Sequence, residues 1–133
     1  IPAAKGYEDE MGEPRMVKTP WYDEDIPFVE AAEIGTEKVI RDHSTIGIVV
    51  TTDGSFGEIN RTSYIESEKR VITELKEIGK PFIVILNTTH PMLPETDNLA
   101  CKLRENYNAP VIPMNIDAMS ERDAVGILKE ALY

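Results

Sequence analysis

The sequence predicts an α/β fold in which a parallel β-sheet lies between layers of helices. Short, continuous runs of β-branched and other apolar residues recur along the chain. Continuous rather than alternating apolarity is typical of strands that are buried on both faces. Longer segments between these runs carry apolar residues at helical spacing. Such an alternation of strands and helices builds a parallel sheet that is covered by helices.

The first 26 residues show neither pattern. They are rich in glycine, proline and acidic residues, which predicts an irregular segment over 1–26 with a short extended piece at Arg15–Lys18. We expect Trp21, Tyr22 and Phe28 to pack this segment onto the helix that follows. The alternative is that they belong to a segment that switches between two conformations. The adjacent acids after Tyr22 are interpreted as a solvated loop, and no metal site is assigned.

The remainder, 27–133, carries the regular pattern. Pro27 suits the first turn of a helix, and the apolar spacing predicts that this helix covers 27–42. The run at 46–50 predicts the first buried strand. Ser63 followed by Glu66 predicts a capping box at the start of the next helix.

Two further strands and two further helices follow. Gly79 ends the second helix, the run at 82–86 predicts the second strand, and Pro94 opens the third helix. The third strand covers 111–114, and its proline favours an edge position. Ser120 and Asp123 predict the cap of a last helix, which carries its apolar residues at Ala124, Val125, Leu128 and Leu132.

Polar residues follow each of the three predicted strands. Ligands of open α/β sheets bind at the carboxyl ends of the strands, so the segments 51–54, 87–90 and 115–118 form the candidate rim. The strand-end rim residues are Thr51, Thr52 and Asp53, and the residues assigned to the base side of a nucleotide pocket are Asn87, Thr88, Asn115 and Asp117.

Asn87 is the sharpest of these candidates. GTP-binding proteins place Asn-Lys-x-Asp after such a strand, where the aspartate accepts two hydrogen bonds from guanine. The sequence here is Asn-Thr-Thr-His over 87–90, so the residue that discriminates for guanine is absent and adenine is favoured. The alternative is that Asn87 only ties two loops together. No G-x-x-x-x-G-K-[ST] motif is present, so the chain has no phosphate cradle of its own, and no catalytic residue is assigned.

Composition excludes several other functions. The net charge of −10, from 14 basic and 24 acidic residues, leaves no basic face, so no nucleic-acid partner is expected. A single cysteine cannot form an internal disulfide, which favours a reducing cytoplasm. The chain begins at Ile1 rather than methionine, which indicates a piece of a longer protein.

Long stretches of the sequence resemble a known family. The runs KGYEDE, PRMVKTPWYDEDIPFVEAAEIGTEKVIRDHSTIGIVVTTDG and ELKEIGKPFIVILN are similar to the ATPase domain of stage IV sporulation protein A. The resemblance implies a three-layer, P-loop-NTPase-like parallel sheet. The chain would hold only the C-terminal half of it, with three core strands and flanking helices. The phosphate-binding loop, the threonine sensors and the metal-holding aspartate of the family would all precede Ile1, and 1–26 would be a switch-like segment.

The resemblance also implies a function. The parent protein would bind ATP and Mg²⁺ and hydrolyse ATP, while the fragment would hold no cofactor and be inactive alone. Hydrolysis would drive self-polymerisation into the basement layer of the bacterial spore coat. That layer would lie in the mother-cell cytoplasm, against the forespore outer membrane, and would recruit other spore coat proteins. Contact with the membrane surface would come from other parts of the protein.

Two alternatives remain open. The first is a GTP-binding switch protein of the same fold. The second is a non-enzymatic, receiver-like interaction module. Asp53 follows a strand, as the phosphorylated aspartate of such a module does, but the sequence places no acid pair to share a metal with it. With either the ATPase or the GTPase interpretation, the strand at 46–50 would lack its neighbour. We expect its bare edge to pair with another copy, to exchange segments, or to be covered by 1–26.

Overall fold

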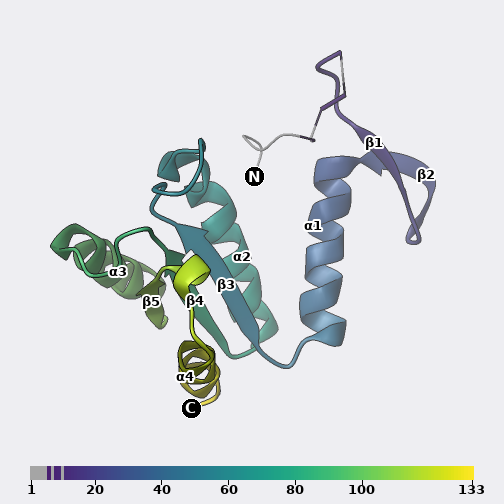
Figure 1. Cartoon of the computed structure of the whole chain (residues 1–133). Coiled ribbons are helices and arrows are strands. Elements are labelled where there is room, and N and C mark those ends of the chain that lie inside the picture. The colour runs from purple at the N-terminus through teal and green to yellow at the C-terminus, as the bar shows by residue number, and fades with distance from the viewer. Residues whose placement is uncertain (1–5, 7, 10) are drawn as a thin grey trace. The chain divides into compact units, whose positions relative to one another are not determined.

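The computed structural model describes residues 6, 8, 9 and 11–133. The chain divides into two compact units, Ile1–Ser44 and Thr45–Tyr133, and each is described by itself (Figure 1). The helix that follows the N-terminal segment therefore belongs to the first unit. Among the described residues, no helix combines the length and apolarity that are needed to cross a bilayer.

The first unit is a β-hairpin followed by a helix. Strands β1 (Met16–Thr19) and β2 (Tyr22–Pro27) pair antiparallel. Helix α1 (Phe28–Lys38) follows and continues into one π-helical turn, Val39–His43. The extended piece predicted near Arg15–Lys18 is confirmed as β1. The second strand was missed, because its side chains are mostly exposed and show no apolar alternation.

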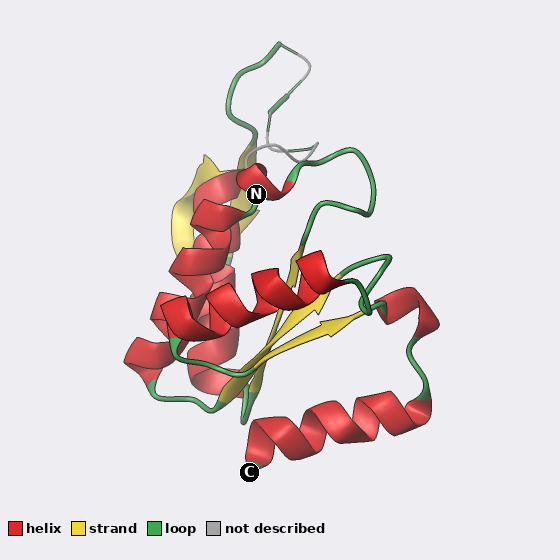
Figure 2. Ribbon diagram, turned by 90° about the vertical axis from the view of Figure 1, so that its left-hand side faces the viewer, coloured by secondary structure: helices red, strands yellow, loops and turns green. Residues whose placement is uncertain are grey.

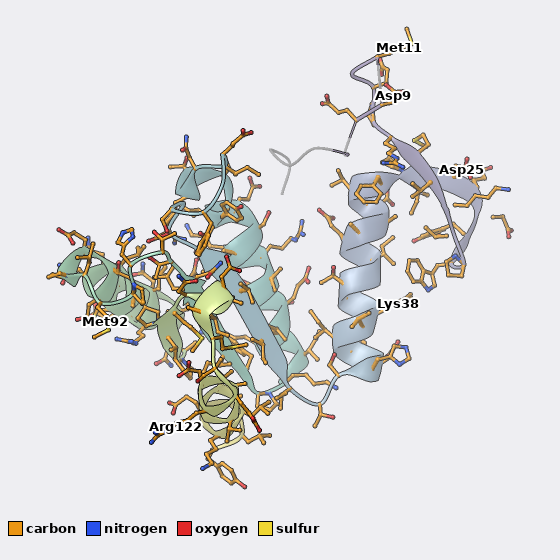
Figure 3. All side chains as sticks on the ribbon, in the orientation of Figure 1. Asp9, Met11, Asp25, Lys38, Met92 and Arg122 are labelled. Carbon is orange, nitrogen blue, oxygen red and sulfur yellow. The ribbon has the colours of Figure 1, made fainter. Side chains whose placement is uncertain are left out.

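Trp21 packs the hairpin onto α1. Its ring lies 3.5 Å from the point that a β-carbon on Gly35 would occupy. The ring therefore approaches α1 at the position where the helix has a glycine and no side chain. The Lys38 ammonium lies 5.8 Å from the centre of the same ring, which is within the range of a cation–π interaction. Lys38 extends from the last turn of α1 (Figure 3). The prediction that aromatic residues pack this segment onto the first helix is confirmed for Trp21, whereas Tyr22 is 52% exposed and Phe28 is the first residue of the helix itself.

The second unit is a three-stranded parallel sheet with flanking helices, as predicted. Its strands are β3 (Gly47–Thr52), β4 (Phe82–Asn87) and β5 (Val111–Met114), in the order β3-β4-β5. The edge position of the strand that contains Pro113 is confirmed. Strand β3 runs two residues beyond the predicted end, because Thr51 and Thr52 continue the register opposite Leu86 and Asn87.

The helices of this unit are α2 (Ile65–Ile78), α3 (Pro94–Tyr107) and α4 (Glu121–Leu132). Figure 2 shows the three parallel strands with helices on both sides of them. Gly79 ends α2 in the left-handed conformation, with φ of 77°, and Ser120 and Asp123 form the predicted capping box of α4. The box predicted at Ser63 and Glu66 is wrong. Residues 61–63 form a 3₁₀ turn, and α2 begins two residues after Ser63.

The two faces of the sheet have separate cores. On one face, Ile83 and Ile85 pack against Ile127 and Ala131 of α4. On the other, α2 and α3 contribute buried residues such as Ile72, Leu75 and Leu103. The apolar residues that the sequence analysis assigned to the last helix are mostly exposed instead: Val125 is 46%, Leu128 45% and Leu132 54% exposed.

Candidate functional site

The carboxyl ends of the three strands lie level with one another. Thr52 is opposite Asn87, and Asn87 is opposite Met114. The loops that begin at Asp53, Thr88 and Asn115 therefore leave the same edge of the sheet. The structure thus brings these predicted rim segments together (Figures 1 and 2).

Asp53 connects the first two of these loops. Its Oδ1 accepts hydrogen bonds from the Ser55 backbone N–H at 2.9 Å and from Ser55 Oγ at 2.6 Å. Its Oδ2 accepts one from Thr88 Oγ1 at 2.6 Å. Thr88 is fully buried, so the last of these bonds lies inside the protein. Three donors aimed at one carboxylate favour its charged form.

The pKa of Asp53 follows from this environment. Burial alone would raise the pKa, but the hydrogen bonds from Ser55 and Thr88 outweigh burial and hold the pKa below the ordinary value of 3.8. His90 contributes a smaller effect in the same direction, with its Nε2 3.8 Å from Asp53 Oδ2. Asp53 is therefore a carboxylate at neutral pH whose oxygens are already engaged within the protein.

Two more hydrogen bonds join the same loops. The Thr89 backbone N–H donates to Ser55 Oγ at 2.9 Å, and the Asp53 backbone N–H donates to the Asn87 carbonyl at 3.4 Å. The loops after β3 and β4 are thus held to one another through both backbone and side chains. Movement of one loop would have to carry the other with it.

Asn87 ties β4 to the loop after β5. Its Oδ1 accepts a hydrogen bond from the Ile116 backbone N–H at 3.0 Å. The Thr88 backbone N–H donates to the Met114 carbonyl at 2.9 Å beside it. Asn115 Oδ1 in turn accepts from the Asp117 backbone N–H at 3.1 Å, which shapes the 3₁₀ turn over 116–118. The predicted connection between Asn87 and a neighbouring loop is present, and its role in holding a base stays a prediction.

Not every predicted rim residue faces the rim. Thr51 is 4% exposed and lies within the sheet, opposite Leu86. The Thr52 side chain bonds within the loop that follows its own strand: its Oγ1 accepts a hydrogen bond from the Gly54 backbone N–H at 3.1 Å. Asp117 is exposed, and its contact with the rim is through its backbone N–H, which donates to Asn115 Oδ1.

A buried ion-pair network next to the rim was missed by the sequence analysis. Arg61 donates to both carboxylate oxygens of Glu68 at 3.1 Å and to the Thr52 carbonyl at 2.9 Å. The Tyr107 hydroxyl donates to Glu68 Oε2 at 2.7 Å. Burial would raise the pKa of Glu68, but hydrogen bonds from Arg61 and Tyr107 help to lower it. Burial and the Glu68 carboxylate raise the pKa of Tyr107.

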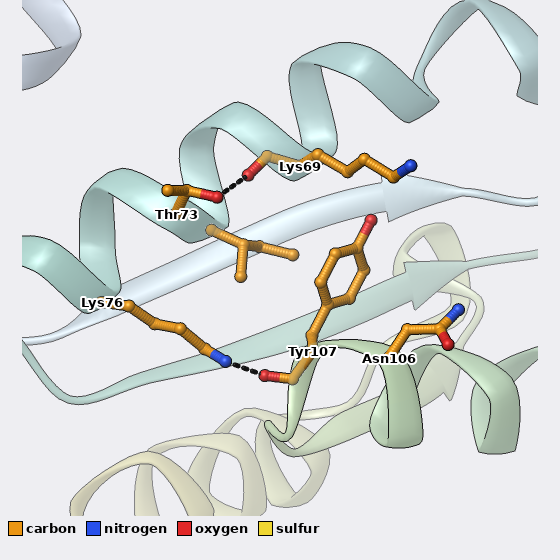
Figure 4. Close-up of a pocket in the computed structure, with 6 residues that line it drawn as sticks. Lys69, Thr73, Lys76, Asn106 and Tyr107 are labelled. Atoms are coloured by element: carbon orange, nitrogen blue, oxygen red, sulfur yellow. Dashed lines mark hydrogen bonds between the residues drawn. The ribbon is translucent and has the colours of Figure 1, made fainter.

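A pocket between α2 and α3 lies apart from this rim. Lys69, Thr73 and Lys76 of α2 line it together with Asn106 and Tyr107 (Figure 4). Lys76 Nζ donates to the Tyr107 carbonyl, and Thr73 donates to the Lys69 carbonyl at 2.8 Å. None of the predicted site residues lines this pocket. Within the described part of the chain, no group of three or more metal-binding side chains occurs either.

Comparisons with known proteins agree with the resemblance in the sequence. The family model described as "Stage IV sporulation protein A, ATPase domain" matches residues 1–133. The chain is 59% identical to the stage IV sporulation protein A of Bacillus anthracis and 59% identical to that of Bacillus subtilis (strain 168), over 133 residues in each case. It is 53% identical to that of Clostridioides difficile (strain 630). No solved structure matches the chain.

These alignments cover 100% of this chain but 27% of each relative. The chain thus spans about a quarter of the length of the curated relatives it matches. The family model covers residues 1–133, the whole of this chain, and the parallel sheet agrees with the α/β fold that the resemblance implies. The chain belongs to the stage IV sporulation protein A ATPase domain family.

Proposed function

We propose that this chain forms the base side of a nucleotide pocket in a longer protein that binds and hydrolyses ATP with Mg²⁺. The observation that carries the proposal is the bond from the Ile116 backbone N–H to Asn87 Oδ1 at 3.0 Å. It joins two neighbouring strand tips at the edge where α/β sheets bind ligands. The Asp53–Thr88 bond at 2.6 Å fixes the third tip beside them.

Adenine suits this rim better than guanine. Thr88 occupies the position where a GTP-binding protein has its stacking lysine, and its side chain is buried and donates to Asp53. His90 occupies the position of the guanine-reading acid. An imidazole has one acceptor nitrogen at most and cannot accept two hydrogen bonds as a carboxylate does.

The wider role is proposed from the relatives, which are named as sporulation proteins. The longer protein would use ATP hydrolysis to assemble with itself into a scaffold for the spore coat, in the cytoplasm of the mother cell. Other spore coat proteins would bind this scaffold. ATP-dependent pelleting of the purified longer protein would test self-assembly, and a fluorescent fusion in sporulating cells would test the location.

The decisive experiment for the pocket uses the longer protein. Asn87→Ala should raise the KM for ATP about tenfold, which corresponds to about 1.4 kcal/mol of lost binding. Asn106→Ala changes the same residue type on an exposed position of α3 and should leave the KM unchanged. An unaltered KM in Asn87→Ala, with the fold intact by circular dichroism, would contradict the proposal.

Competition between nucleotides separates this proposal from the GTP-binding alternative. Excess GTP should inhibit ATP hydrolysis by the longer protein only weakly, and His90→Asp should shift the preference toward GTP. Equal competition by GTP in the unaltered protein would favour the GTP-binding switch. The 133-residue chain alone should show no turnover, because it lacks the lysine and backbone cradle that hold the β- and γ-phosphates.

The receiver-like alternative is not favoured by this geometry. A phosphorylated aspartate needs an accessible carboxylate, but the Asp53 side chain is 11% exposed. Its oxygens already accept bonds from Ser55 and Thr88. Incubation with acetyl phosphate, followed by mass spectrometry, should leave Asp53 unmodified.

A further inference from the structure

The pocket between α2 and α3 carries positive charge in a strongly acidic chain. It has a volume of about 580 Å³, which lies in the range of small-molecule sites. Among the described residues that line it, the charged ones are Lys69 and Lys76, although the whole chain has 24 acidic and 14 basic residues. Ile72 and the ring of Tyr107 form its apolar part. A pocket of this composition suits a small anion with a short apolar body.

The two lysines are placed to bind two separate anionic groups. They lie two turns apart on α2, on one face of the helix and with about 10 Å between them along its axis. In the described part of the chain, the Lys69 ammonium has neither a hydrogen-bond nor an ion-pair partner. The Lys76 ammonium donates to the Tyr107 carbonyl, which leaves it two further donors for a ligand. In Figure 4, the Tyr107 ring lies between the ends of the two lysine side chains.

One wall of the pocket belongs to the buried ion-pair network. The Tyr107 hydroxyl donates to Glu68 Oε2 at 2.7 Å. The Glu68 side chain is 2% exposed, and both its oxygens accept from Arg61 at 3.1 Å. Because Arg61 pairs with Glu68, this carboxylate does not offset the charge of the lysines. Removing a partner from a buried charge is costly, so Glu68 holds the Tyr107 ring in its place.

The same network reaches the strand-tip rim. Arg61 donates to the Thr52 carbonyl at 2.9 Å, and Thr52 lies opposite Asn87 in the sheet. Asn87 is the residue on which the proposed nucleotide pocket depends. A continuous chain of contacts therefore runs from Tyr107, through Glu68 and Arg61, to the end of β3.

We propose that the pocket between α2 and α3 binds a small dicarboxylate, and that the bound dicarboxylate strengthens ATP binding at the rim. One carboxylate pairs with the Lys69 ammonium and the other with the Lys76 ammonium. The ligand then holds Tyr107 against Glu68, which keeps the end of β3 in its present conformation. The effect on ATP rests on the proposed nucleotide pocket, whereas the binding of the dicarboxylate does not.

Calorimetric titration of the longer protein with glutarate tests the site in the absence of nucleotide. Glutarate should bind, and glutaramide, which has the same carbon chain without the charges, should not. Lys69→Gln should weaken glutarate binding about fivefold, which is the upper range for an exposed ion pair. Lys129→Gln makes the same change on an exposed position of α4, on the other face of the sheet, and should leave glutarate binding unchanged.

Three results would overturn the site. They are the absence of glutarate binding, equal binding of glutaramide, and equal losses of glutarate affinity in Lys69→Gln and Lys129→Gln. Neither substitution removes a side-chain contact within the described part of the chain, so both variants should fold.

The effect on ATP is measured as the dissociation constant of a non-hydrolysable ATP analogue. Saturating glutarate should lower this constant about fivefold, and the analogue should lower the glutarate constant by the same factor, because coupling between two binding sites is reciprocal. Tyr107→Phe keeps the ring but removes the hydroxyl that donates to Glu68. Glutarate should still bind to this variant, and its effect on the analogue should be lost.

The two proposals fail in different ways. Asn87→Ala should weaken binding of the analogue and leave glutarate binding intact, so the loss of the nucleotide pocket would not remove the dicarboxylate site. Displacement of glutarate by the analogue would place both ligands in one pocket and overturn the proposal. An affinity for the analogue that saturating glutarate does not change would also overturn it. If Tyr107→Phe does not fold, Lys69→Gln should move the response of the analogue to about fivefold higher glutarate concentrations.

Discussion

The two units of the chain are built by different means. None of the described residues of Ile1–Ser44 is buried, whereas every buried core residue belongs to Thr45–Tyr133. The first unit is held by contacts between consecutive elements, such as Trp21 against Gly35. The second is held by parallel pairings between strands far apart in sequence. The rim therefore depends on the core of the second unit, and the first unit has no described buried residue that would hold it as firmly.

A core truncation in the second unit should have the largest effect. Leu86 is fully buried in β4, and Leu86→Ala should cost about 2–5 kcal/mol of unfolding free energy. The half-buried Ile34 in α1 is the matching position in the first unit, and Ile34→Ala should cost clearly less. Native-state hydrogen exchange of β4 and α1 peptides in the longer protein measures both. Equal losses would remove the distinction between the units.

A strained glycine should give the next largest effect. Gly54 has φ of +86°, and a β-carbon there would lie 2.9 Å from the Arg61 backbone nitrogen. Gly54→Ala should therefore cost about 2–3 kcal/mol. Gly12 in the first unit has φ of +77° with nothing within 4 Å of its β-carbon position. Gly12→Ala should cost about 1 kcal/mol, from the left-handed backbone alone. Exchange rates of β3 and hairpin peptides would reveal the difference, and similar costs would argue against the contact with Arg61.

Acid should weaken the second unit more than the first. Folding lowers the pKa of Asp53 below 3.8 and of Glu68 below 4.5. As the pH falls, the unfolded chain binds protons at these groups before the folded chain does, so protonation favours unfolding. Their stabilisation is complete above about pH 4.5 and is lost as the pH falls through the lowered values.

Asp53→Asn should remove part of this acid dependence and cost about 1 kcal/mol at neutral pH, because a charged acceptor is lost. Exchange of β3 and β4 peptides between pH 3 and pH 7 provides the measurement, and Asp25→Asn on exposed β2 is the control. An acid profile unchanged by Asp53→Asn would mean that this carboxylate does not stabilise the rim.

The smallest effect should have the opposite sign. Gly35 lies inside α1, and a β-carbon there would meet the Trp21 ring at 3.5 Å, an ordinary contact distance. Gly35→Ala should stabilise the first unit by about 0.5–1 kcal/mol, because alanine loses less backbone entropy in a helix. Exchange of α1 peptides should slow while exchange of β4 peptides stays the same. Faster exchange in α1 would indicate that the ring is packed too closely for a methyl group.

The sequence was informative where burial and chain order decide the structure. The apolar runs at 46–50 and 82–86 predicted two strands of the sheet, and their order predicted that Asp53 and Asn87 lie at one edge. It was not informative where a partner comes from a distant segment. The roles of Ser55 and Arg61 depend on loop paths that no local pattern encodes. Only the local part of the role of Ser55 had a signal, since Asp-Gly-Ser over 53–55 favours a turn in which the aspartate accepts hydrogen bonds from the residues that follow.

The predicted end of β3 and the predicted start of α2 were wrong for similar reasons. Thr51 and Thr52 are polar, so the apolar run ended before the strand did, and pairing with β4 extended it. Ser63 matched the capping pattern, but the 3₁₀ turn at 61–63 brings Arg61 to Glu68 instead. Tertiary contacts overrode the local signal in both cases.

Trp21 is the only tryptophan in the chain, and it lies in the hairpin beside the Lys38 ammonium. Intrinsic fluorescence of the 133-residue chain would therefore monitor the release of the hairpin from α1. It would report very little on the unfolding of the parallel sheet. An emission change at low denaturant, well before the loss of far-ultraviolet ellipticity, would be the optical signature of the first unit. A fluorescence midpoint taken alone would understate how stable the strand-tip rim is.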